Sequence, residues 1–334
     1  MPDKMFKKVL VTGGAGYVGA VLIPKLLAAG YEINVLDLYL YGDDVFDGVK
    51  PNSALTEFKG DLRDLGVVQS ALDGCDCVIH LACISNDPSF ELNPALGKSI
   101  NLDCFQPLVK AAKESGVKRF VYASSSSVYG VKNDPSVTED LSLEPLTDYS
   151  KFKADCEAVL QQETGEDFVT CTIRPATVCG FSPRQRLDVI VNILTNHAVN
   201  NGRIKVFGGE QKRPNIHIED MTDLYVQLLT EQDEKINGKI YNAGGKNHTV
   251  NELAEIVKQT VGGDLVVDVL PSDDLRSYHV CSDRLKRDIG WEPKLGIKEA
   301  VQDLMDAFDR GDLINSMEDS RYYNIRKMQE VHLA

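Results

Sequence analysis

The first 180 residues alternate between short runs of β-branched and apolar residues and helix-length amphipathic stretches. Six of the runs are typical of strands, at residues 8–12, 32–37, 55–59, 77–81, 119–123 and 168–173. Helices fit between them, at residues 19–29, 65–72, 97–115 and 148–164. Strand–helix alternation of this kind predicts a parallel sheet with helices on both of its faces. The expected fold class is therefore α/β, a Rossmann-type doubly wound parallel sheet.

Beyond Gly180 the alternation loosens into loops rich in Arg, Asn and Gly. A helix is expected near 187–200, and a helix at 220–229 with a strand at 239–242 indicates a return to the sheet. Two further amphipathic stretches predict helices at 250–261 and 297–309. We expect residues 1–180, with returning segments at about 217–245, to form the large domain. Residues 181–216 and 246–334 would form a smaller lobe over the carboxyl edge of the sheet, where ligands bind in such folds.

Charge and hydropathy exclude several classes of partner. The chain carries 36 Lys and Arg against 50 Asp and Glu, a formal net charge of −14. A surface this acidic repels nucleic acid and anionic lipid. No stretch of 18 apolar residues is present, and the apolar run near the N-terminus is too short for a signal peptide. We expect a cytoplasmic protein with no nucleic-acid or membrane partner.

The eight cysteines, and His217 among the histidines, raise the question of a metal site. Without an export signal, the cysteines are expected to be reduced thiols. Cys75 and Cys77 are the only close pair, and we interpret them as small buried hydrophobic residues. His217 lies in a strand-like run with no clustered ligands, so we interpret it as a packing histidine. No metal is expected.

A glycine-rich turn joins the first expected strand to the first expected helix. Gly13, Gly16 and Gly19 are spaced three apart in Thr-Gly-Gly-Ala-Gly-Tyr-Val-Gly. Such glycines permit a tight turn, close approach of a pyrophosphate, and packing of the helix on the strand. Asp37 ends the next strand, where a carboxylate accepts hydrogen bonds from the adenosine ribose and repels a 2′-phosphate. The turn therefore predicts a dinucleotide cofactor, NAD rather than NADP. Asp61, after the third strand, is placed either to cap the adenine or to make an ordinary turn.

A serine, a tyrosine and a lysine follow this half of the chain. Ser124 to Ser127 end the fifth strand, and Tyr149 and Lys153 lie four apart at the start of the next helix, so they share one face. A phenol is a poor base at neutral pH, but a neighbouring ammonium favours the phenolate. A serine hydroxyl can bond both phenol and substrate. Together these groups can take a proton from a carbinol while a nicotinamide takes the hydride.

These motifs, taken together, resemble the extended short-chain dehydrogenase/reductases, and most closely the nucleotide-sugar epimerase/dehydratase group. The resemblance runs from about residue 8 to about residue 308. It implies Ser125 as the catalytic hydroxyl, Tyr149 as the base, Lys153 as its helper, and Asn101 as support for the lysine. It implies cofactor contacts from Gly13, Gly16, Tyr17, Val18, Gly19, Asp37, Asp61, Leu62, Leu81, Ala82, Cys83, Tyr149, Lys153 and Pro175.

The resemblance also implies the partner, a nucleotide-diphosphate sugar. Arg213 and Arg276 match the two arginines that contact the diphosphate, for which bidentate guanidinium–phosphate pairing is a sound reason. Arg184 and Arg186 are expected to reach either the sugar or the diphosphate, and the sequence does not decide between the two. The implied substrate-binding residues are Ser126, Thr177, Arg184, Arg186, Asn192, Arg213 and Arg276.

Two departures from the pattern bear on the reaction. Dehydratases of this group carry an Asp-Glu pair where this chain has Ser126 and Ser127, so water elimination lacks its acid and base. Thr177 stands where an asparagine that touches the substrate is common in the group, so the identity of the sugar stays open. We expect an NAD-dependent nucleotide-sugar 4-epimerase. The alternatives are a 4-dehydrogenase or reductase, an epimerase at another carbon, and a non-catalytic NAD-binding regulator.

The expected assembly is a homodimer. The helices at 97–115 and 148–164 carry Leu108, Val109, Val159 and Leu160, which exceed what one sheet face needs. The resemblance implies that these helices pair with a twofold mate into a four-helix interface.

Overall fold

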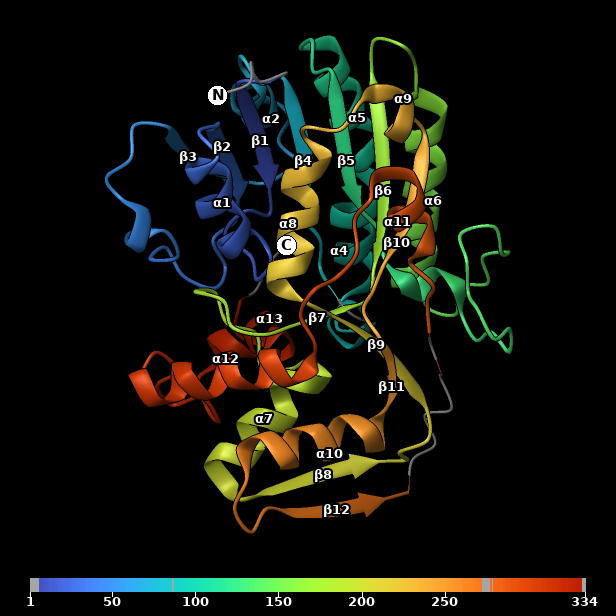
Figure 1. The fold of residues 1–334 in the computed structure, drawn as a ribbon. Coiled ribbons are helices and arrows are strands. Elements are labelled where there is room, and N and C mark those ends of the chain that lie inside the picture. Colours follow the sequence, from blue (N-terminus) through green and yellow to red (C-terminus); the bar gives the residue numbers. More distant parts are fainter. Residues whose placement is uncertain (1–5, 86, 272–276, 278, 332–334) are drawn as a thin grey trace.

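The computed structural model describes residues 6–85, 87–271, 277 and 279–331. Its largest element is a seven-stranded parallel sheet in the order β10-β6-β5-β4-β1-β2-β3 (Figure 1). The expected Rossmann-type α/β fold is confirmed. The strands are β1 (Lys8–Thr12), β2 (Glu32–Asp37), β3 (Leu55–Lys59), β4 (Cys77–His80), β5 (Arg119–Ala123), β6 (Val169–Pro175) and β10 (Lys239–Ala243).

Helices cover both faces of this sheet because successive side chains of a strand point to opposite sides. In β1, Val9 and Val11 belong to the core under α1 (Gly19–Ala28) and α8 (Ile218–Leu228). Leu10, between them, belongs to the core on the other face. That second core is covered by α2 (Leu65–Leu72), α5 (Phe105–Glu114) and α6 (Asp148–Glu163).

The helix expected at 97–115 is present but is interrupted by a π-helical turn. The segment forms α4 (Pro94–Lys98), a π-helical turn at Ser99–Asp103, and α5. A π turn inserts an extra residue and is frequent at functional sites. Here it carries Asn101, whose side chain is buried.

The side chains that suggested a twofold interface lie inside the chain. Leu108, Val109 and Leu160 are buried in the core between the sheet and its helices, and Val159 packs against that core. The three buried side chains are not available to a partner, so the argument from them is wrong. The homodimer itself stays a prediction.

A smaller lobe lies beyond the carboxyl ends of the parallel strands (Figure 1). It contains helices, a two-stranded sheet and a three-stranded sheet. The sequence pattern did not distinguish the strands of these two sheets from loops. The core of the lobe joins α7, α10 and α12. The elements are β7 (Thr177–Cys179), α7 (Ile190–Asn201), β8 (Arg203–Phe207), β9 (Lys212–His217), β11 (Asn247–Thr249), α10 (Val250–Val261), β12 (Val266–Leu270) and α12 (Ile297–Arg310).

Short elements complete the chain. α11 (Asp283–Ile289) packs beside β10, and α13 (Asn324–Glu330) ends the described chain close to α3 (Asp87–Glu91). The remaining elements are α9 (Asp233–Ile236) and 3₁₀ turns at Asp47–Val49, Ser126–Tyr129 and Ser320–Tyr322.

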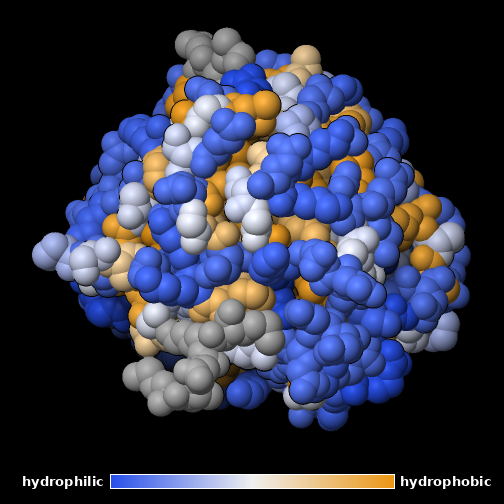
Figure 2. Space-filling view, turned by 90° about the horizontal axis from the view of Figure 1, so that it is seen from above, coloured by the Kyte–Doolittle hydropathy of each residue, from blue (hydrophilic) through white to orange (hydrophobic). Residues whose placement is uncertain are grey.

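The surface opposite the lobe is mostly hydrophilic, with hydrophobic residues in separate patches (Figure 2). This distribution agrees with the excess of acidic residues in the sequence. No helix in the described part of the chain is long and apolar enough to cross a membrane.

Candidate active site

A cavity of about 560 Å³ lies where the parallel strands end and the lobe begins. Its volume is in the range of small-molecule and cofactor sites. Among the predicted residues that the structure describes, all line this cavity except Asn101 and Asn192. Arg276 lies outside the described residues. Segments far apart in sequence therefore meet here, from the glycine turn near residue 13 to Met328 of α13.

The glycine turn has no room for side chains at two of its positions. Gly13 has φ +72°, and a Cβ there would lie 2.6 Å from the backbone nitrogen of Ala82. A Cβ on Gly19 would lie 2.3 Å from the carbonyl oxygen of Gly14. The backbone of the first βα turn is thus exposed to the cavity at the start of α1, which is how such turns receive a pyrophosphate. The residues present fit a dinucleotide.

The carboxylate of Asp37 is fixed at the end of β2. It accepts hydrogen bonds from the backbone N–H of Ala15 at 3.0 Å and of Tyr39 at 2.8 Å. Burial raises the pKa of Asp37 above its ordinary value, although these two bonds oppose the shift. The first bond ties the residue to the glycine turn. Asp37 thus lines the cavity next to the glycine turn, at the end of the strand from which a carboxylate bonds the adenosine ribose in such folds.

Asp61 has a partner that the sequence did not indicate. Its two carboxylate oxygens accept hydrogen bonds from the guanidinium of Arg63, the shortest at 2.7 Å. The bonds from Arg63 lower the pKa of Asp61. Asp61 and the adjacent Leu62 both line the cavity.

Tyr149 and Lys153 lie one turn apart at the start of α6. The helix begins there because Thr147 and Ser150 cap it reciprocally, with the Ser150 N–H donating to Thr147 Oγ1 at 3.3 Å. The Lys153 ammonium donates to the carbonyl oxygen of Ala123, at the end of β5, at 2.6 Å. It lies 5.9 Å from the centre of the Tyr149 ring. The lysine is 4% exposed, so its charge acts in a partly dehydrated site.

The serines after β5 face the same cavity. Ser125 has extended backbone and caps the 3₁₀ turn, accepting the N–H of Ser127 at 3.1 Å. The two hydroxyl oxygens, Ser125 Oγ and Ser127 Oγ, are 2.9 Å apart. Ser126 also lines the cavity. A hydroxyl therefore stands at the position where dehydratases of the family would need a carboxylate.

A buried ion pair supports these groups from behind the cavity. Glu157, one turn after Lys153, pairs with Arg174 of β6 at 2.6 Å, and the two side chains are 5% and 3% exposed. Ser124 donates to Glu157. Arg174 also donates to the hydroxyl of Tyr129 at 2.7 Å. The network joins α6, β6 and the serine-bearing end of β5.

The two predicted residues outside the cavity lining hold the backbone around it. The Asn101 side chain accepts the N–H of Ile84 at 2.8 Å and donates to its carbonyl at 2.9 Å, which fixes the loop after β4. The Asn192 amide accepts the Gly180 N–H at 3.0 Å and donates to the Tyr17 hydroxyl at 3.0 Å and the Arg186 carbonyl at 2.8 Å. The roles predicted for both asparagines stay predictions.

Cations gather in the cavity of this acidic chain. Its lining includes Lys153, Arg184, Arg186 and Arg213. Arg186 pairs with Asp188 at 2.6 Å and also donates to Ser85 at 3.2 Å. Arg213 is on β9 of the lobe. A cluster of arginines inside a protein of net charge −14 favours an anionic ligand.

Sequence reasoning missed several lining residues. Tyr41 follows β2 and Ser85 follows β4, so strand ends were a signal that could have found them. Asn324 and Met328 come from α13 and have no such signal, because their position depends on how the chain returns from the lobe.

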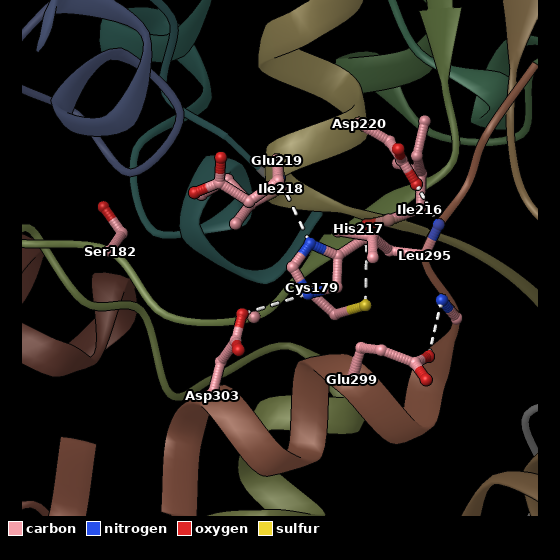
Figure 3. A network of polar contacts seen from close by, with 12 residues as sticks. Cys179, Ser182, Ile216, His217, Ile218, Glu219, Asp220, Leu295, Glu299 and Asp303 are labelled. Carbon is pink, nitrogen blue, oxygen red and sulfur yellow. Dashed lines mark hydrogen bonds and ion pairs between the residues drawn. The ribbon is translucent and has the colours of Figure 1, made fainter. Parts of the chain in front are cut away.

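His217 takes part in a network of polar contacts that links the start of α8 to α12 of the lobe (Figure 3). Its Nδ1 accepts the N–H of Glu219 at 3.2 Å, and its Nε2 lies 3.1 Å from Asp303 of α12. The side chain is 2% exposed. Its neighbour Cys179 donates to the carbonyl of Ile216, and burial raises the pKa of the Cys179 thiol. Nowhere in the described ranges do three His, Cys, Asp or Glu side chains form a metal-binding group.

Several known proteins are similar to this chain over most of its length. A UDP-glucose 4-epimerase of Bacillus subtilis is 29% identical over 88% of this chain and 95% of its own length. One of Lactobacillus helveticus is 27% identical over 86% and 92%. Among solved structures, the dTDP-glucose 4,6-dehydratase DesIV of Streptomyces venezuelae, with NAD and TYD bound, has a TM-score of 0.82. It is 25% identical, over 91% of this chain and 98% of its own.

The family model described as the NAD dependent epimerase/dehydratase family matches residues 9–244, more than half of the chain. The matched range contains the glycine turn, Asp37, the serines after β5, and the Tyr149–Lys153 pair. The expectation of NAD as the cofactor is confirmed. With both the motifs and the fold in agreement over this range, the chain belongs to the NAD dependent epimerase/dehydratase family.

Proposed function

We propose that the protein is a nucleotide-sugar 4-epimerase, which inverts the configuration at sugar C4 by oxidation and return of the same hydrogen. The observation that carries the proposal is the cavity itself. It joins Ser125, Tyr149 and Lys153 to the cofactor turn and has serines at the positions of the dehydratase acid and base. Bound NAD supplies the hydride acceptor.

Tyr149 is the group that takes the proton from the C4 hydroxyl. Lys153, held by the Ala123 carbonyl, lies on the same helix face and favours the phenolate electrostatically. The Ser125 hydroxyl orients and polarises the C4 oxygen. When the proton returns, the same phenol donates it, so that one residue acts as base and then as acid.

The carboxylates around the cavity support epimerisation over dehydration. Among described residues, those that line it are Asp37, Asp61 and Asp188. Asp37 is bonded to the glycine turn, Asp61 to Arg63, and Asp188 to Arg186 and to the N–H of Asn324. Each is therefore engaged, and none lies within the serine segment 124–127. Within this segment no carboxyl group is present to remove the C5 proton or to protonate the C6 oxygen, as dehydration requires.

The arginines support a nucleotide diphosphate as the handle of the substrate. Arg213 enters the cavity from β9, and Arg186 lies between Ser85 and Asp188. Because guanidinium groups pair with phosphate oxygens in a bidentate way, we assign Arg213 to the diphosphate of the sugar nucleotide. The similar proteins named UDP-glucose 4-epimerase make UDP-glucose and UDP-galactose the first pair to test.

We also propose a homodimer. With the large apolar residues of α5 and α6 mostly buried in the chain, the exposed residues on these two helices are polar, apart from Ala158. A twofold contact through these helices would therefore use polar residues such as Lys110, Glu114, Asp155 and Gln161.

The experiment is Tyr149→Phe, which removes one oxygen. Loss of a general base costs ~10²- to 10⁴-fold in rate, so turnover should collapse while NAD binding persists. Ser125→Ala should cost less, because its hydroxyl is not the proton acceptor. The matched control is Tyr241→Phe, which removes a hydroxyl bonded to the Lys235 carbonyl away from the cavity and should leave turnover unchanged.

Product is followed by chromatography, and reduced cofactor by its absorbance. Full activity of Tyr149→Phe rejects the site. Stoichiometric release of reduced cofactor by the unmodified protein rejects epimerisation and favours a 4-dehydrogenase.

A further inference from the structure

The segment at residues 180–186 of the lobe lies directly on the glycine turn. The Tyr17 hydroxyl donates to the Gly180 carbonyl at 2.7 Å, and the Ser182 hydroxyl donates to the Tyr17 carbonyl at 2.7 Å. Tyr17 is thus bonded to this segment through both its side chain and its backbone. These contacts place Arg184, two residues further on, beside the turn that receives the cofactor.

Arg184 lies on the cofactor side of the cavity. Its guanidinium carbon is 3.5 Å from the centre of the Tyr41 ring, and Tyr41 follows β2, the strand that ends in Asp37. One terminal nitrogen donates to the Asn324 side chain at 2.6 Å. Arg184 is therefore bracketed by the glycine turn on one side and by the end of β2 on the other.

The guanidinium is also incompletely satisfied. Arg184 is 5% exposed and lines the cavity, yet its Nε has no hydrogen-bond partner among the described residues. Burial lowers the pKa of Arg184, although nearby Tyr41, Asp188 and Asp37 oppose the shift. A buried donor without an acceptor is costly, more so on a charged group. An anionic ligand in the cavity would supply the acceptor.

We propose that Arg184 binds the diphosphate of the dinucleotide cofactor and approaches it from the lobe. In folds of this kind the pyrophosphate lies over the first βα turn, at the N-terminus of the helix that follows, and the adenosine ribose lies at the end of β2. The cofactor diphosphate is then held by backbone N–H groups of one domain and by a guanidinium of the lobe. Arg213, on β9, is left for the diphosphate of the sugar nucleotide.

This arrangement ties the cofactor to the C-terminal helix. Asn324, which accepts from Arg184, donates to Ser85 at 2.8 Å, and its backbone N–H donates to Asp188 at 2.8 Å. In this arrangement, residues 180–186 and the start of α13 cover the cofactor.

The test is calorimetric binding to Arg184→Gln, with Arg213→Gln as the matched control. The probes are NAD, ADP-ribose, NADP and UDP-glucose. The inference concerns cofactor binding alone, so it can fail or succeed without regard to the epimerase proposal. Loss of a hydrogen-bonded charge predicts that Arg184→Gln weakens NAD and ADP-ribose by roughly 10- to 100-fold. Arg213→Gln should leave both within about twofold.

Three outcomes would overturn the proposal. Arg184→Gln could bind NAD as tightly as the unmodified protein, could lose affinity for UDP-glucose alone, or could lose affinity for NADP alone, which would assign the residue to a 2′-phosphate.

Arg184→Lys serves as a second variant, since it keeps the charge and should bind NAD more tightly than Arg184→Gln does. Asn324→Ala separates positioning from contact, because it removes a partner of Arg184 and leaves the guanidinium; it should weaken NAD less than Arg184→Gln.

Discussion

Substitution of Glu157 by Gln should destabilise the protein far more than the same change elsewhere on α6. Glu157 accepts three hydrogen bonds from Arg174, of 2.6, 3.0 and 3.3 Å, and another from Ser124. Burial alone would lower the pKa of Arg174, but these contacts outweigh it, and the pKa is raised. The guanidinium is charged and 3% exposed, so neutralising its partner leaves a buried charge uncompensated.

Breaking a buried ion pair in this way costs about 3–5 kcal/mol. For a chain of this length, that corresponds to a fall in Tm of roughly 4–7 °C if unfolding is cooperative. The matched control is Glu163→Gln, at the end of the same helix, whose pair with Lys113 is 3.0 Å long and partly exposed. An exposed pair contributes about 0–1 kcal/mol.

Both variants are unfolded by heat and by urea, in parallel with the unmodified protein. Because Ser124 and Lys153 flank Glu157, Glu157→Gln should also lower kcat, whereas Glu163→Gln should not. Equal shifts in Tm for the two variants would refute the assignment of Glu157 and Arg174 as a supporting ion pair.

Two further predictions concern pH and assembly. Burial, and then the charge of Lys153, lower the pKa of His80 to about 3 from an ordinary 6.5. Between these two pH values the unfolded chain therefore binds more protons at His80 than the folded chain does. The free energy of unfolding should keep its full value above about pH 6.5 and decrease as the pH falls toward 3. Urea unfolding at pH 7.5 and 5.0 should show about 2 kcal/mol more loss in the unmodified protein than in His80→Asn, and equal losses would contradict it. Light scattering at micromolar concentration should give the mass of a dimer, and a monomer alone would remove the homodimer.

The central strands of the large sheet, such as β1, β4 and β5, were predictable because they are buried on both faces, whereas the edge strand β3 is only partly buried. Four strands of the sheet, at residues 8–12, 32–37, 55–59 and 119–123, have the bounds that the apolar runs indicate. The lobe was not predictable in the same way. In β8, exposed and buried residues alternate over only five positions, and β12 contains Asp268, so neither strand has a continuous apolar run.

The site shows the same division. Gly13, Asp37, Tyr149 and Lys153 are marked by local spacing, because the turn and the helix face that carry them are set by neighbouring residues. The surroundings of Arg184 are not local: Tyr41 and Asn324 lie about 140 residues away on either side. A single sequence carries no signal for contacts at such separations, and so the sequence left Arg184 between the sugar and the diphosphate.

The bonding on the cofactor side of the cavity suits the proposed epimerase. On the cofactor side, Tyr17 makes bonds from its hydroxyl and its carbonyl to the lobe, and Asn192 bonds both Tyr17 and residues 180 and 186. An enzyme that returns the hydrogen to the opposite face of its substrate must keep the cofactor in place while the oxidised sugar turns. The bonds that join Tyr17 and Asn192 to residues 180–186 meet the first need, because they hold the lobe against the turn that receives the cofactor.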